Sequence, residues 1–188
     1  AIEALEQMLG DAASAARVIE ILERVFRRNG QYDRLVPLYE KAIEYADDEE
    51  ERVGRLKDLA RFLESELAEP AAAFEAMRRA FLLDPSDAEA LDEVERLASV
   101  ADRWSALRGL AEEVARERLS LSGTTKRDIF LRAAAWYRDH LNDFAASEVA
   151  LRSALELDPD ASEAYARLIV LLRAVGREAE LVAALRAW

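Results

Sequence analysis

AFLLDPSDAEAL, residues 80–91, and ALELDPDASEAY, residues 154–165, are two copies of nearly the same sequence. Their leading alanines, Ala80 and Ala154, stand 74 residues apart. A sequence period of roughly 20 to 50 residues is typical of a solenoid, and a longer period can contain two structural units. The repeat therefore indicates the class of fold before any other motif is considered.

The composition favours helix over nearly the whole chain. Glycine and proline, the residues that most often interrupt helices, number only 6 and 4 in 188 residues. Alanine, which has the highest helix propensity, is abundant. Hydrophobic residues make up 52% and charged residues 34%, a balance that predicts a folded protein without disordered regions. We therefore predict an all-α protein.

Charge and residue usage exclude several classes of function. The formal net charge of -12 argues against a nucleic-acid binder, because phosphate binding depends on clustered lysine and arginine. No run of 18 apolar residues is present, so we expect no membrane insertion. The absence of cysteine excludes disulfides and thiolate chemistry but fits cytoplasm and periplasm alike. The first ten residues lack the features of a signal peptide, and the cytoplasm is our first expectation.

Turn residues and helix caps divide the chain into helices. Proline follows the turn at Ala68, Asp84 and Asp158 each precede a proline that ends a helix, and Gly176 marks another turn. The predicted helices are 12–28, 31–46, 49–67, 70–83, 87–100, 103–120, 125–141, 144–157, 161–175 and 178–188. They form hairpins at about 12–46, 49–83, 87–120, 125–157 and 161–188, after a partial helix at 1–9, in one segment spanning 1–188.

Apolar residues recur at helical spacing in both helices of each predicted hairpin. Leu56, Leu59 and Leu63 form such a stripe in a first helix, and Leu107, Ala111 and Val114 form one in a second helix. Trp104 and Trp188 fall in the apolar register of second helices, where core packing is favoured over ligand stacking. Trp136 is expected to pack between hairpins.

The pattern resembles the tetratricopeptide repeat family. Units close to 34 residues, a late alanine in the second helix and a following proline carry the resemblance, which is best at 73–88 and 147–162. The 74-residue alternation is also similar to repeats in large bacterial scaffold proteins. The resemblance implies a right-handed α-solenoid that acts in protein–protein interaction. The slot that favours a small glycine in the family holds Glu23, Glu95 and Ile169 here, which bears on the regularity of the superhelix.

The sequence contains no pattern that points to catalysis or to a cofactor. His140 is the only histidine, and completion of a helix C-terminus accounts for it better than catalysis does. The acidic run at 47–51 lacks the glycine and the alternating oxygen ligands of a calcium loop. Phosphate-binding, metal-ligand and nucleophile motifs are missing. We predict that the protein is not an enzyme and that it has no cofactor or metal.

Cationic residues on the first helices are the candidate binding site. In the family that the chain resembles, first helices line a concave groove, and residues one and four positions beyond the leading apolar slots face into it. In this sequence the cations at these positions are Arg17, Arg24, Arg27, Lys57, Arg61, Arg96, Arg132, Arg138, Arg167 and Arg173. They predict a groove for a protein or peptide partner, with an acidic segment as the first candidate.

Three alternatives stay open. These cations could instead pair with neighbouring carboxylates four residues away on the same helix, each pair contributing roughly a few tenths of a kcal/mol. The segment could also be a structural spacer, or the regulatory domain of a larger multidomain protein. RNA-reading helical repeats are the rival family, and the acidic charge argues against them. The sequence predicts no oligomeric state.

Overall fold

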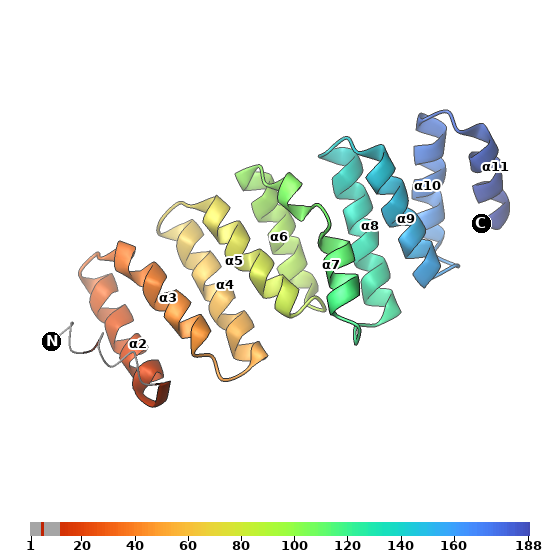
Figure 1. Cartoon of the computed structure of the whole chain (residues 1–188). Helices are drawn as coiled ribbons and strands as arrows, with labels where there is room; N and C mark the ends of the chain where they lie inside the picture. Colours follow the sequence, from red (N-terminus) through yellow and green to blue (C-terminus); the bar gives the residue numbers. More distant parts are fainter. Residues whose placement is uncertain (1–4, 6–11) are drawn as a thin grey trace. The chain divides into compact units, whose positions relative to one another are not determined.

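The computed structural model describes Leu5 and residues 12–188, with side chains for Leu5 and residues 17–188. Over the described residues the chain forms ten α-helices, labelled α2 to α11, two short 3₁₀ helices and no strand. The predicted all-α class is confirmed, and successive helices pair as helical hairpins (Figure 1). The predicted partial helix at 1–9 lies outside the described residues, apart from Leu5.

The chain divides into two compact units between Asp102 and Arg103, inside the predicted hairpin 87–120. Unit 1 contains α2 (Ala12–Arg28), η1 (Tyr32–Arg34), α3 (Leu35–Glu44), α4 (Glu49–Ser65), α5 (Pro70–Leu83) and α6 (Ala88–Ala101). Unit 2 contains η2 (Trp104–Leu107), α7 (Leu110–Glu117), α8 (Gly123–Asp139), α9 (Phe144–Leu157), α10 (Ser162–Ala174) and α11 (Glu178–Ala187).

Apolar faces turned toward neighbouring helices form the core of each unit. In unit 1, α5 packs between α4 and α6 (Figure 1). Its Phe74 and Phe81 are completely buried. Ala80, also completely buried, occupies little volume where the helices approach each other. In unit 2, α9 packs against α8 and α10, and Leu151 and Ala154 are buried in the same way.

The 74-residue repeat recurs in the bounds of the helices. α4 and α8 both have 17 residues, α5 and α9 both have 14, and the members of each pair begin 74 positions apart. α6 and α10 begin at the same interval. The segment α4–α5–α6 of unit 1 therefore has a counterpart, α8–α9–α10, in unit 2, and residues of the two can be compared one by one.

The prediction of one helix over 103–120 is wrong. Asp102 adopts left-handed backbone, a 3₁₀ turn follows, and Gly109 at φ 79° begins the short α7. Similarly, the predicted helix 31–46 begins as a 3₁₀ turn and is α-helical only over α3. A positive φ interrupts an α-helix, and glycine reaches it at little steric cost.

The tryptophans are arranged differently from the expectation that two lie in the core. Trp104 is half-buried and stacks on His140, the residue that caps the C-terminus of α8. The two ring centroids are 3.6 Å apart, and the ring planes are 3° from parallel. Trp188 is 60% exposed, so its assignment to the core is wrong. Trp136, which the sequence predicts to pack between hairpins, is 3% exposed.

Two glycine-to-alanine substitutions should change stability in opposite directions. Gly54 lies inside α4 and an added methyl group would meet no atom within 4 Å, so Gly54→Ala should raise the free energy of unfolding by about 0.5–1 kcal/mol. Gly109→Ala should lower it by about 1 kcal/mol, because alanine is strained at φ 79°. Urea unfolding followed by circular dichroism measures both, and shifts of the same sign would contradict the assigned backbone conformations.

Candidate functional site

Most of the predicted groove cations of unit 1 are held by carboxylates of the chain itself. Arg24 lies 3.9 Å from Glu20, Arg27 lies 3.1 Å from Glu23, and Arg61 lies 3.0 Å from Asp58, each pair on one helix. The partners of Lys57 and Arg96 come from a neighbouring helix and are described below. Arg17 is exposed.

In unit 2 the predicted cations show the same behaviour. Arg138 lies 2.6 Å from Asp139, and Arg167 lies 2.6 Å from Glu163 while donating at 2.7 Å to the carbonyl oxygen of Leu131. Arg132 is half-buried, and Arg173 is exposed. The alternative of pairing with a carboxylate four residues away describes Arg24, Arg27 and Arg167, while the other paired cations use carboxylates at other spacings or on a neighbouring helix. Exposed pairs are weak and exchange partners at little cost.

Two of the predicted residues bridge α4 and α6 and thereby define a groove. The Lys57 ammonium on α4 binds the carboxylate of Asp87, which caps the N-terminus of α6. Further along, the guanidinium of Arg96 on α6 lies 2.5 Å from Glu64 of α4 and 2.6 Å from Glu93 of its own helix. These bridges fix the distance between the two first helices of unit 1. We call the space between them the α4–α6 groove.

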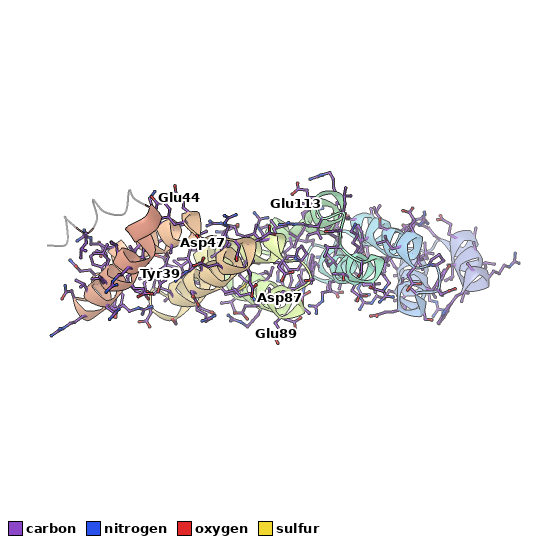
Figure 2. All side chains as sticks on the ribbon, turned by 90° about the horizontal axis from the view of Figure 1, so that it is seen from below. Tyr39, Glu44, Asp47, Asp87, Glu89 and Glu113 are labelled. Atoms are coloured by element: carbon purple, nitrogen blue, oxygen red, sulfur yellow. The ribbon has the colours of Figure 1, made fainter. Side chains whose placement is uncertain are left out.

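The α4–α6 groove contains two hollows that share Lys57. The first, here called the acidic hollow, has a volume of about 640 Å³, and the second, the middle hollow, has about 200 Å³. The acidic hollow is lined by Glu49, Glu50, Val53, Gly54, Lys57, Leu83, Asp84 and Asp87. The middle hollow is lined by Lys57, Arg61, Met77, Glu89, Ala90 and Glu93. Figure 2 shows Asp87 and Glu89 on one edge of unit 1 and Glu44 on the opposite edge.

The charge along this groove is uneven. Around the acidic hollow, four carboxylates face a single ammonium group, whereas cations and carboxylates balance around the middle hollow. The hydrogen bond from Lys57 lowers the pKa of the Asp87 carboxyl, and its ionised form is stabilised further by the backbone amide of Ala90. The predicted basic groove is thus mixed in sign, with its largest hollow predominantly acidic.

A third hollow, of about 320 Å³, lies on the α2–α3 side of α4 and shares Arg61 with the middle hollow. At its base the hydroxyl of Tyr39 donates to Glu23 at 2.7 Å and accepts from Arg27 at 2.8 Å. The guanidinium carbon of Arg27 lies 5.3 Å from the centre of the Phe62 ring, within cation–π range. Arg27 of α2 and Arg61 of α4, both predicted to face the groove, therefore line the same hollow.

The described residues offer interaction surfaces more readily than chemistry. Within residues 12–188 as described, no group of three or more histidine and carboxylate side chains converges closely enough to hold a metal ion. None of the described helices combines the length and the apolar composition needed to cross a membrane. Neither result assigns a ligand, and the α4–α6 groove has the volume to accept one.

Sequence reasoning missed the acidic hollow. Its residues come from the start of α4, the end of α5 and the start of α6, and the sequence pattern treated the first two groups as a solvated linker and a turn. Gly54 was the available signal. A glycine inside an α-helix costs up to about 1 kcal/mol relative to alanine, so such a position invites a functional reason.

No protein-family model matches the chain, and no curated protein sequence matches it. Solved structures do match, 26 chains in all. One crystal structure of MamA is 18% identical with a TM-score of 0.47 and covers 86% of this chain and 89% of its own. Another is 18% identical with a TM-score of 0.47 over 93% and 90%. The class of the protein, an all-α array of helical hairpins, rests on the chain's own helices.

Stability at alkaline pH tests the Tyr39 cluster. Burial, followed by the hydrogen bond to Glu23, raises the pKa of Tyr39 from its usual 10.0 to about 12. Folding therefore favours the neutral phenol, and this contribution is complete below pH 10 and lost as the pH rises toward 12. At pH 7, Tyr39→Phe should cost about 1 kcal/mol of unfolding free energy.

The difference between wild type and Tyr39→Phe should shrink as the pH rises above 10, because only the wild type carries the ionising hydroxyl. Urea unfolding of both proteins from pH 7 to pH 11.5 or so measures it, and other tyrosines and lysines cancel in the comparison. A difference that stays constant across this range would contradict the raised pKa of Tyr39 and with it the burial and hydrogen bonding that cause it.

Proposed function

We propose that the protein is a non-enzymatic interaction scaffold and that unit 1 binds a segment of a partner protein along the α4–α6 groove. One observation carries the proposal: two hollows that share Lys57 follow one another along α4, the acidic hollow before the Lys57–Asp87 bridge and the middle hollow between that bridge and the Arg96–Glu64 bridge. A groove between two rigid helices suits an extended or helical segment, which can bury its side chains in successive hollows.

Arg61 supplies the contact for an acidic residue of that segment. Its side chain is 71% exposed, it lines both the middle and the third hollow, and its ion pair is with Asp58 on the same helix. Such exposed pairs contribute roughly 0–1 kcal/mol, so a partner carboxylate can replace Asp58 without a large penalty. Arginine binds a carboxylate through two parallel hydrogen bonds, which adds orientation to attraction.

A structural spacer is the second candidate, favoured by the internal pairs of Arg24, Arg27 and Arg138. A spacer needs no accessible cations and no hollows. The lining of the α4–α6 groove by Gly54 and the exposure of Arg61 support the scaffold over the spacer.

The proposal is tested with a displayed library of random 12-residue peptides, selected on the wild-type chain and measured by fluorescence anisotropy. Arg61→Glu should weaken binding of the selected peptides about fivefold or more, because an attractive contact becomes repulsive. Lys41→Glu is the matched control, since Lys41 also pairs with a carboxylate three residues away, Glu44, on the opposite edge of unit 1 (Figure 2). This control should bind like the wild type.

Two results would count against the scaffold. Equal loss of affinity in both variants would mean that net charge, not the groove, attracts the peptides. A selection that enriches no peptide on the folded wild-type chain relative to the same chain denatured would favour the spacer.

A further inference from the structure

The two repeats differ at the place of the acidic hollow. Along the 74-residue interval, Val53 on α4 corresponds to Arg127 on α8, and Asp84 at the end of α5 corresponds to Asp158 at the end of α9. In unit 2 the guanidinium of Arg127 lies 2.6 Å from Asp158, and only 25% of this arginine side chain is exposed. In unit 1 the aligned position holds valine, and the space beside Asp84 is open.

Both aspartates accept the backbone N–H two residues on, and Asp84 also accepts the hydroxyl of Ser86 with the same oxygen. Asp158 accepts the backbone N–H of Asp160 with Oδ1 and the Arg127 guanidinium with Oδ2. Asp84 accepts the backbone N–H of Ser86 with Oδ1 at 3.1 Å. Its Oδ2, the atom that would match the arginine-binding oxygen, has no hydrogen-bond partner among the described residues. Asp84 lines the hollow, and the oxygen that corresponds to the arginine-binding oxygen of Asp158 is left without a hydrogen bond from the described residues.

We propose that the acidic hollow of unit 1 binds an arginine side chain of the partner segment, whose guanidinium takes the place beside Asp84 that Arg127 takes beside Asp158. The inference rests on the proposed function of the α4–α6 groove and specifies the partner's chemistry. Val53 and Leu83 line the hollow for the aliphatic part of the arginine, and Glu50 and Asp84 supply negative charge around its head.

Gly54 supports this occupant independently of charge. It lines the hollow from inside α4, its counterpart in unit 2 is Asp128, and an added methyl group would touch no atom of the protein within 4 Å. Packing inside unit 1 therefore does not require glycine here, although glycine lowers helix stability. Room for a bound side chain gives the residue a function.

The geometry also fixes a direction for the partner segment. Gly54 and Arg61 are seven residues apart on α4, which corresponds to about 10 Å along the helix axis. An arginine in the acidic hollow and an acidic residue at Arg61 should therefore lie about 10 Å apart in the segment, or roughly two turns if it is helical. A segment bound in the opposite direction would place its acidic residue in the acidic hollow and its arginine beside Arg61, where like charges repel.

The direct test uses Nα-acetyl-arginine methylamide as the probe and ¹⁵N-labelled full chain, with binding followed by amide chemical shifts. Shifts should concentrate at Gly54 and Asp84, and the citrulline analogue, which has the same shape without charge, should bind about tenfold or more weakly. Asp84→Asn keeps the Oδ1 acceptor for Ser86 and should weaken arginine binding by a similar factor. Asp158→Asn, the same substitution at the matched position, should leave it unchanged.

Val53→Arg provides a second route, because it rebuilds in unit 1 the arginine that unit 2 already contains. This variant should lose binding of the probe. Shifts of equal size for citrulline, no shift at Gly54 and Asp84, or full affinity in Asp84→Asn would each overturn the arginine site. The scaffold proposal stands or falls separately, because the peptides selected on the wild type can depend on Arg61 whether or not they contain arginine.

Discussion

A helical hairpin cannot bury its apolar face alone, so neighbouring helices must pack against it. The other features of this protein depend on that packing. In unit 1, α5 lies between α4 and α6 and contributes the fully buried Phe74 and Phe81 to the core. Because α5 holds both first helices, their outer faces stand side by side without filling the space between them. The α4–α6 groove is therefore a consequence of core packing, and the Lys57–Asp87 and Arg96–Glu64 bridges then fix its width.

Electrostatics in this acidic chain acts mainly at short range. Carboxylates outnumber cations by 38 to 26, so most arginines and lysines have a carboxylate within reach before any partner arrives. Pairs within one helix, such as Arg61–Asp58, contribute little to stability and can open to a ligand. Pairs between helices, such as Lys57–Asp87, position elements that are distant in sequence. Lys57 thus joins two helices beside the groove, whereas the Arg61 side chain remains available to a ligand.

Sequence patterns predicted the regular parts of the fold well and the site only in part. The bounds of α5 and α9 follow from prolines and turns that act locally, so the predicted ranges agree with the structure. The break at Gly109 was missed because a glycine between good helix formers gives no sign of its φ angle. The partners of Lys57 and Arg96 lie about 30 residues away and are set by packing, which spacing along one helix cannot reveal. The expectation of a groove lined by first-helix cations did not include the carboxylates that the end of α5 and the start of α6 bring beside α4.

The two repeats show that one turn can serve two purposes. A leucine–aspartate–proline turn ends α5 and α9 alike, and each aspartate uses one oxygen to hold its own turn. The second oxygen remains to be satisfied. In unit 2 Arg127 binds it, which lowers the pKa of Asp158 and links α8 to the end of α9. In unit 1 valine replaces that arginine and glycine follows it, so this link is absent, the helix is less stable locally, and a hollow remains. Glycine inside α4 lowers helix propensity, so local helix stability does not account for this residue, whereas an open hollow leaves room for an external cation.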